Sequence, residues 1–195
     1  EYDDLFNPSS NLKPASPLAD VLRPKELKDF YGQLNLLYKD SLFRNAILND
    51  NVSNIILSGP PGVGKTTLVG IISNYSRASV ITMNAIFAGI KELRNAIKEA
   101  KERLIKSKRK TILFIDEVHR FTSAQQDALL PSIENGTITF IGATTENPYF
   151  AVNQALLSRS RILKLELLKY EELLQIIQKV INYYAELDEP KRIHL

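Results

Sequence analysis

One short motif constrains this chain more than any other feature. Residues 59–67 read GPPGVGKTT, the pattern G-x-x-x-x-G-K-[S/T] of a phosphate-binding loop. Its glycines are expected to adopt backbone angles that other residues avoid, so that successive N–H groups surround a phosphate chain. Lys65 then supplies a positive charge for the terminal phosphates, and the Thr66 hydroxyl is a ligand for Mg²⁺. The loop residues expected to contact the ligand are Gly59, Pro60, Pro61, Gly62, Val63, Gly64, Lys65, Thr66 and Thr67.

The flanks of the loop have the pattern that the motif requires. Residues 54–58 are a short apolar run typical of a buried strand, and residues 65–76 carry apolar side chains at helical spacing. The N-terminus of that helix would face the phosphates, where its dipole favours anions. A glycine-rich turn that matches by chance is the alternative, and both flanks argue against it.

Apolar strands alternate with helical segments along the rest of the chain. Further strands are predicted at 79–83, 111–115, 138–143 and 161–166, and further helices at 89–106, 122–135 and 169–185. This alternation predicts an α/β fold, a parallel five-stranded sheet flanked by helices, with ligands at the carboxyl ends of the strands. Within 122–135, Thr122 and Gln125 form a capping box, and Pro131 should kink or shorten the helix.

Three regions follow from composition and pattern. Residues 1–17 carry three prolines and are predicted to be an extended arm, while short helical stretches are expected between 18 and 49. Residues 18–167 would form the core, and residues 168–195 the first part of a helical lid that the chain truncates. Because the chain begins with Glu1 rather than Met, we expect it to be a piece of a longer protein.

Composition excludes several classes of protein. The chain has no Cys, so it has neither a disulfide framework nor a thiolate metal site, and two His at 119 and 194 are too few to indicate zinc. No run approaches the roughly 18 apolar residues of a membrane span, and no signal-peptide pattern is present, so we expect an intracellular protein.

Positive charge is concentrated in one stretch, although the net charge is only +3. A solvated helix face and loop is one interpretation of this stretch. A surface that contacts the phosphates of a nucleic acid is the other. The cations are Lys98, Lys101, Arg103, Lys106, Lys108, Arg109 and Lys110.

Two acidic residues end the strand at 111–115. Asp116 is suited to hold Mg²⁺ through water, because that ion keeps much of its hydration shell. Glu117 is suited to polarise a water in line with the γ-phosphate. A surface turn is the alternative, but paired acids at the end of a buried strand are costly without a cation nearby.

Two later residues are candidates for the same site. Thr145 follows the strand at 138–143 and would lie between the two strands already named, where it could position the attacking water. A hydroxyl that only caps the strand end is the alternative. Arg159 would ordinarily form a surface ion pair; in a ring it could instead reach a neighbour's γ-phosphate, which is worth about 10³–10⁵ in rate.

With these motifs in this order, the chain resembles AAA+ ATPases of the clamp-loader clade. More narrowly, it is similar to the replication-associated recombination protein A family, which includes the Werner-helicase-interacting protein and the yeast maintenance-of-genome-stability ATPase. The blocks that carry the resemblance lie at 17–20, 22–25, 32–33, 59–67, 114–121, 125–131, 134–136, 141–148 and 155–159.

The resemblance implies a role for each motif. It makes Lys65 and Thr66 the Walker A pair, Asp116 and Glu117 the Walker B pair, Thr145 sensor 1 and Arg159 an arginine finger acting in trans. It also implies an adenine pocket lined by the segment 22–33, with candidate contacts at Leu22, Arg23, Tyr31 and Gly32. Asn84, after the second strand, would hold Glu117 inactive until a partner binds.

Three departures from the family pattern stand out. Ser160 occupies a position where relatives often have Cys, and Tyr31 replaces a smaller apolar residue, which would reshape the adenine pocket. The chain also stops in the first helix of the lid, before a sensor 2 arginine. We therefore expect this piece alone to bind nucleotide weakly and to hydrolyse it slowly.

The sequence thus predicts an ATP-binding and ATP-hydrolysing motor core that uses Mg²⁺. The resemblance adds action on forked, gapped or single-stranded DNA in replication-fork maintenance, recombination or repair. It also implies homo-oligomers and replication or repair proteins as partners, no membrane, and a location in the nucleus of a eukaryote or in the cytoplasm or nucleoid of a bacterium. A nucleotide-gated scaffold is one alternative, although it would not need Glu117 or Arg159. A small-molecule kinase is another, and it leaves Arg159 and residues 142–148 unexplained.

Overall fold

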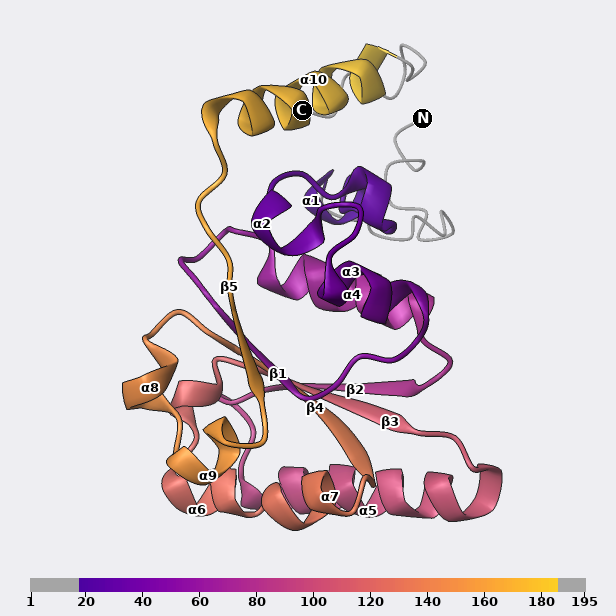
Figure 1. Ribbon diagram of the computed structural model, residues 1–195, viewed down its shortest axis with the longest axis vertical. Coiled ribbons are helices and arrows are strands. Elements are labelled where there is room, and N and C mark those ends of the chain that lie inside the picture. The colour runs from indigo at the N-terminus through magenta and orange to yellow at the C-terminus, as the bar shows by residue number, and fades with distance from the viewer. Residues whose placement is uncertain (1–17, 186–195) are drawn as a thin grey trace, which may run out of the picture.

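The computed structural model describes residues 18–185. The extended arm predicted at 1–17 and the last part of the predicted lid, 186–195, lie outside the described residues. Five parallel strands form one sheet in the order β2-β3-β4-β1-β5 (Figure 1). In chain order these are β1 (Ile55–Ser58), β2 (Ser79–Asn84), β3 (Thr111–Asp116), β4 (Ile138–Thr144) and β5 (Arg161–Lys164). The predicted α/β class and all five predicted strands are confirmed.

The central strands are apolar along their whole length because both faces of the sheet are covered. In β1, Ile55 and Leu57 pack into one hydrophobic cluster, and Ile56 packs into the cluster on the opposite face. In β3, Phe114 and Leu113 divide between the two clusters in the same way. Successive side chains of a strand point to opposite faces, so a doubly covered strand requires an unbroken apolar run.

Helices form a layer on each side of the sheet (Figure 1). One layer contains α3 (Leu42–Leu48) and α4 (Lys65–Tyr75), and the other contains α5 (Ile90–Ser107). The short stretches expected before residue 49 are α1 (Leu18–Val21), a 3₁₀ turn at Leu27–Asp29 and α2 (Leu34–Leu37). They lie on the α4 side, where Leu27, Leu37 and Phe43 enter the core.

The helix predicted at 122–135 is broken in two, as Pro131 led us to expect. Its halves are α6 (Ser123–Asp127) and α7 (Leu130–Glu134), with Pro131 in the first turn of α7. Proline lacks an N–H and is tolerated in a first turn, where no helical partner exists. The capping box is confirmed: Gln125 N donates to Thr122 Oγ1 at 3.3 Å, and Thr122 N donates to Gln125 Oε1 at 2.9 Å.

Two short helices between β4 and β5 were not predicted. They are α8 (Pro148–Ala151) and α9 (Gln154–Leu157), and each begins after an asparagine. Asn147 Oδ1 accepts the N–H of Tyr149 at 3.1 Å, and Asn153 Oδ1 accepts that of Leu156 at 2.8 Å. The two asparagines were the available signals, because asparagine is a strong N-cap residue.

The last described helix, α10 (Tyr170–Ala185), follows β5 and contains no buried residue. The segment leading to it is tied to the N-terminal region by Gln33, which is only 6% exposed. Gln33 Nε2 donates to the carbonyl oxygen of Glu166 at 2.7 Å, and Glu166 N donates to Gln33 Oε1 at 2.9 Å. None of the helices within 18–185 has the length and apolar character needed to cross a membrane.

Candidate functional site

The strand order brings three loops together at the carboxyl edge of the sheet. Because β4 lies between β3 and β1, the loops that follow these strands are neighbours. Thr145 therefore lies between the phosphate loop and the acidic pair, as predicted. A cavity of about 310 Å³ opens here, and it is lined by Arg23, Pro61, Gly62, Gly64, Lys65, Thr66, Thr67, Asp116, Glu117 and Thr145.

The loop glycines are required for two different reasons. Gly62 and Gly64 have φ values of +80° and +96°, the left-handed conformations that were expected. Gly59 does not share this conformation, so the angle-based explanation is wrong at that position. There, a Cβ would overlap the backbone of Leu165, which follows β5. Close approach of a neighbouring segment is what requires glycine at residue 59.

Lys65 supplies a buried positive charge to the lining of the cavity. Lys65 is the first residue of α4 and is only 7% exposed. Its Nζ donates to the carbonyl oxygens of Gly59 at 2.7 Å and Pro60 at 2.8 Å. Burial lowers the pKa of Lys65, while the negative charges of Glu117 and Asp116 act in the opposite direction. An anion bound in the cavity would therefore relieve a desolvated cation.

Asp116 and Thr66 place oxygen ligands in the same cavity. Burial raises the pKa of Asp116, and a hydrogen bond from Glu117 N to Asp116 Oδ1 at 3.1 Å acts against this shift. Within 18–185 there is no group of three or more His, Cys, Asp or Glu that could hold a metal alone. The oxygen atoms of Thr66 and Asp116 fit Mg²⁺, which takes one or two protein oxygens and fills its other positions with water and phosphate.

Glu117 is held in an unusual backbone conformation. Its φ of +52° is uncommon for a residue with a side chain, and such conformations cluster at functional sites. Its carboxylate oxygen Oε2 accepts a hydrogen bond from Thr145 Oγ1 at 3.4 Å. Glu117 and Thr145 are thus in direct contact.

His119 belongs to the same cluster, although the sequence motifs did not predict a place for it in the site. Its side chain is only 5% exposed, and Nδ1 lies 3.3 Å from Glu117 Oε2. The same nitrogen is 3.0 Å from Thr144 Oγ1, and Nε2 is 3.4 Å from Glu146 Oε1. The available signal was its position two residues after Glu117, together with the polar residues that end β4.

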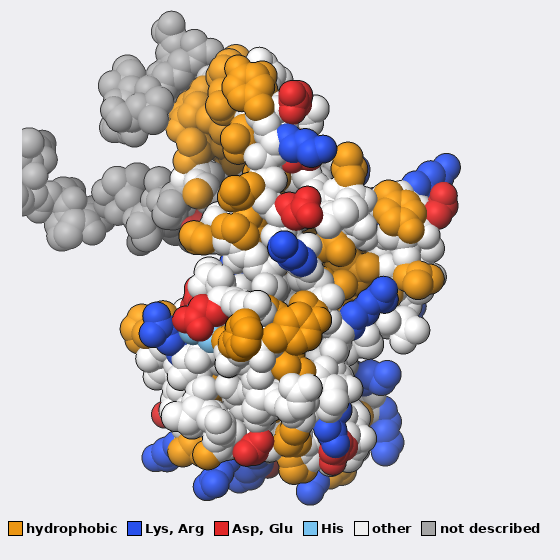
Figure 2. All heavy atoms as spheres, turned by 60° about the vertical axis from the view of Figure 1, so that its left-hand side comes forward, with side chains coloured by type: hydrophobic (Ala, Val, Ile, Leu, Met, Phe, Trp, Pro, Cys, Tyr) orange, Lys and Arg blue, Asp and Glu red, His pale blue; other side chains and the backbone are white. Residues whose placement is uncertain are grey.

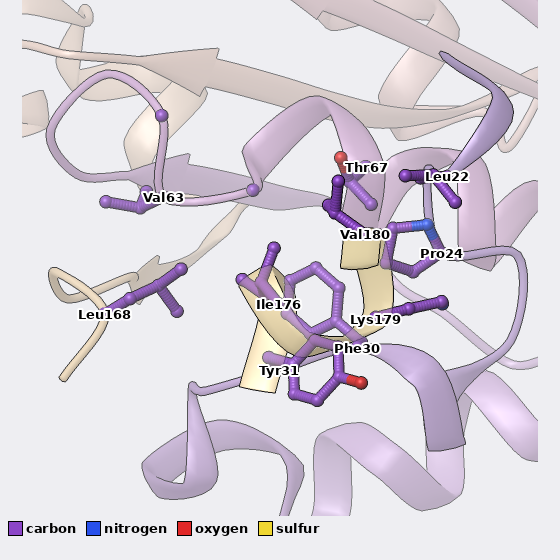
Figure 3. A pocket seen from close by; sticks show the side chains of 12 residues that line it. Leu22, Pro24, Phe30, Tyr31, Val63, Thr67, Leu168, Ile176, Lys179 and Val180 are labelled. Carbon is purple, nitrogen blue, oxygen red and sulfur yellow. The ribbon is translucent and has the colours of Figure 1, made fainter. Parts of the chain in front are cut away.

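A second, apolar cavity of about 160 Å³ adjoins the first. Figure 3 shows side chains of the N-terminal segment, the phosphate loop and α10 converging on it. Its lining residues are Leu22, Pro24, Phe30, Tyr31, Gly62, Val63, Gly64, Thr67, Leu168, Ile176, Lys179 and Val180. The two cavities share Gly62, Gly64 and Thr67, so an apolar compartment meets a polar one at the loop, as a base and its phosphates require.

The predicted adenine contacts are distributed over both cavities. Leu22 and Tyr31 line the apolar cavity, whereas the charged side chain of Arg23 lines the polar one. Gly32 packs behind this surface, where a Cβ would lie 2.5 Å from Leu168 Cδ2. The lining residues on α10 were missed, because nothing in the sequence places that helix over the loop.

Two other candidates, Arg159 and Asn84, do not line the cavity. The Arg159 carbonyl oxygen accepts a hydrogen bond from Asn54 Nδ2 at 3.2 Å. Because Asn54 immediately precedes β1, Arg159 lies at the opposite edge of the sheet from the phosphate loop. Its Nε donates to Glu134 Oε1 at 2.7 Å. Asn84 lies beside Asp116 in register, but its Oδ1 accepts the N–H of Ile86 at 2.8 Å. No hydrogen bond joins Asn84 to Glu117 in the described part of the chain, and its inhibitory role stays a prediction.

A phosphate loop after β1, an inner strand of a five-stranded parallel sheet, and an acidic pair at the end of β3 together define a nucleotide-binding ATPase domain of the P-loop class. The chain belongs to the ATPase family associated with various cellular activities (AAA), whose family model matches residues 55–170.

Named relatives agree with this assignment. Replication-associated recombination protein A of Haemophilus influenzae is 47% identical over 176 residues, which cover 90% of this chain and 38% of the relative. The protein of the same name from Escherichia coli strain K12 is 48% identical over 85% of this chain and 37% of its own length. ATPase WRNIP1 of Dictyostelium discoideum is 44% identical over 87% of this chain and 19% of its own length. The chain thus spans well under half the length of these relatives.

Among solved structures, the Holliday junction branch migration motor RuvB of Thermotoga maritima has a similar fold. It superposes with a TM-score of 0.68 and 30% identity, over 84% of this chain and 55% of that chain. The resemblance to an AAA+ ATPase related to replication-associated recombination protein A is therefore confirmed.

Proposed function

We propose that this chain is the motor core of an ATPase that hydrolyses ATP with Mg²⁺ and acts on DNA in replication-fork maintenance, recombination or repair. One observation carries the proposal: the phosphate loop, Asp116, Glu117 and Thr145 line a single polar cavity, which opens beside an apolar cavity of the kind a base needs.

The loop, Lys65, Thr66, Asp116 and Glu117 each have a task in this reaction. The N–H groups of the loop and the Lys65 ammonium bind the phosphates, and Lys65 exchanges its carbonyl partners for phosphate oxygens. Thr66 and Asp116 would hold Mg²⁺, which neutralises charge on the phosphates when bound. Glu117 takes a proton from the water that attacks the γ-phosphorus, and ADP leaves.

The first test is ATP hydrolysis by the intact protein, with and without DNA, beside a Glu117→Gln variant. We expect the variant to bind ATP normally and to lose about 10²–10⁴ in kcat, the usual contribution of a general base. ATP binding without hydrolysis by the unaltered protein, in every condition, would instead favour the nucleotide-gated scaffold.

Arg159 is proposed to complete the site of a neighbouring copy. It cannot serve its own site, because it lies at the opposite edge of the sheet, close to the start of β1. A mixing experiment tests this: Glu117→Gln and Arg159→Ala should each be inactive alone, and mixed oligomers should recover activity. Recovery is expected because an intact cavity then meets an intact arginine. Full activity of Arg159→Ala alone would refute the role.

The DNA partner is supported by the positive charge on α5 and on residues 108–110, which follow it. Residues 90–110 contain nine Lys and Arg against three Glu, a net charge of +6, although the whole chain has only +3. Figure 2 shows Lys and Arg side chains gathered at the lower end of the molecule, the end at which α5 lies in Figure 1. Spacings of three and four residues place Lys91, Arg94, Lys98 and Lys101 on one stripe of the helix, and all four are exposed.

A salt titration of DNA affinity tests this surface. Changing the four cations of the stripe to Gln should reduce the slope of log K against log salt by about 0.9 for each DNA phosphate that the variant no longer neutralises. Exposed Lys25 and Lys39, in the N-terminal segment before α3, provide the matched control. An unchanged slope in the stripe variant would remove α5 from the interface. The same titration also tests the basic stretch at 106–110 when its charges are reversed.

The names of the relatives support the biological setting. The bacterial relatives are named for replication-associated recombination, and the structural relative is a branch migration motor. By the same reasoning, replication or repair proteins are the proposed partners. The bacterial nucleoid or cytoplasm, or the eukaryotic nucleus, is the proposed location.

A further inference from the structure

The proposed chemistry does not use His119, although its ring makes three polar contacts beside the site. It follows β3 in a 3₁₀ turn (Val118–Arg120), and its side chain is buried. The groups facing the ring come from two segments: the carboxylate of Glu117, and the hydroxyl of Thr144 and carboxylate of Glu146 at the end of β4.

The contacts of Glu117 are asymmetric. Thr145 Oγ1, at 3.4 Å, and His119 Nδ1, at 3.3 Å, both bind the same oxygen, Oε2. Within 18–185, the other oxygen, Oε1, has no hydrogen bond or ion pair. A carboxylate that is to accept a proton from water needs one oxygen fixed and the other available. This arrangement provides both.

The ring is itself held on both sides. Nε2 lies 3.4 Å from Glu146 Oε1. Nδ1 lies 3.0 Å from Thr144 Oγ1. The same Thr144 oxygen accepts the N–H of Glu146 at 3.0 Å. Each ring nitrogen therefore faces a carboxylate oxygen. The ring thereby connects Glu117 to the segment that contains Thr145.

We propose that His119 is a positioning residue for ATP hydrolysis: through Nδ1 it fixes Glu117 Oε2, leaves Oε1 directed to the water, and couples that carboxylate to the end of β4. The inference rests on the proposed role of Glu117 as the base. His119 touches neither nucleotide nor water in this mechanism and acts only through Glu117.

The test uses three substitutions in the intact protein. An Asn side chain places an amide N–H near the Nδ1 position, a Gln side chain places one near the Nε2 position, and Phe keeps the ring without either donor. We expect His119→Asn to stay within about 5-fold of the unaltered kcat. His119→Gln and His119→Phe should lose about 10–100-fold, the effect of a misplaced reacting group, with KM for ATP unchanged in all three.

A double variant separates positioning from a general structural effect. In Glu117→Gln the carboxylate is already absent, so adding His119→Phe should lower the remaining rate no further. Thermal midpoints of all variants are measured in parallel. The inference would be overturned if kcat fell across the variants in proportion to the thermal midpoint. It would also be overturned if His119→Asn lost as much kcat as His119→Phe.

The same rates separate the role of His119 from that of Glu117. If Glu117→Gln retains the unaltered kcat, the proposed base is wrong, whatever His119 does. If Glu117→Gln is inactive while His119→Phe is fully active, only the role of His119 is refuted.

Discussion

Gly59 offers a direct test of how the phosphate loop is built. A methyl group at this position would overlap the carbonyl oxygen of Leu165 and would lie 3.2 Å from its carbonyl carbon and 3.3 Å from its Cβ. Leu165 cannot retreat easily, because its side chain is fully buried and its N–H donates to Ser58 O at 2.7 Å. Gly59→Ala is therefore a case of overpacking between β1 and the end of β5.

The cost follows from known overpacked cores. Inserting a methyl group into a site that cannot relax costs about 1–3 kcal/mol. For a domain of this size each kcal/mol lowers the thermal midpoint by about 2–4 °C, so Gly59→Ala should melt about 2–12 °C lower.

Gly70 is the matched control. It lies within α4, it is exposed, and an added Cβ would meet nothing within 4 Å. Removing a helical glycine gains about 1 kcal/mol, so Gly70→Ala should melt about 2–4 °C higher. Calorimetry or circular dichroism of the transition assigned to this domain measures both. A Gly59→Ala variant as stable as the unaltered protein would refute the packing argument.

Three further predictions concern buried polar groups. Burial raises the pKa of Asp116, so its ionised form opposes folding above that pKa, and the penalty disappears as the carboxyl is protonated in acid. Asp116→Asn should therefore raise the thermal midpoint at pH 7.5 without Mg²⁺ and raise it less near pH 4, as calorimetry at the two pH values would show. Gln33→Met removes both hydrogen bonds to the Glu166 backbone and should cost about 1–3 kcal/mol, seen as a lower urea midpoint with an unchanged m-value. Ser160 Oγ is buried with no hydrogen-bond partner in the described chain, so Ser160→Ala should stabilise by about 1 kcal/mol in the same assay, and a loss of stability would mean that the hydroxyl is satisfied.

The features that could be predicted from the sequence are encoded over short distances. The phosphate loop and the capping box at Thr122 are fixed by residues within a few positions of each other. The strands were predictable because a doubly covered strand, such as β1 or β3, must be apolar at every position. The break at Pro131 follows from the missing N–H of one residue.

The features that were missed depend on contacts between distant segments. Glycine is required at Gly59 because Leu165 lies beside it, and only the pairing of β1 with β5 brings the two together. His119 enters the site because β4 is inserted next to β3, which brings Glu146 to its ring. The lining residues of α10 have the same origin, since the segment that leads to that helix is held by hydrogen bonds between Gln33 and the Glu166 backbone.

The sheet order also determines when the phosphate loop can form during synthesis. Ile55 in β1 pairs with Ile141 in β4 and with Arg161 in β5, so the strand that carries the loop has no neighbour until much later segments exist. At about 5–20 residues per second, the ribosome takes several seconds or more to deliver them. For that time an apolar strand stays unpaired, and unpaired apolar strands are prone to aggregate. The phosphate loop can therefore take its folded form only after nearly the whole domain has emerged.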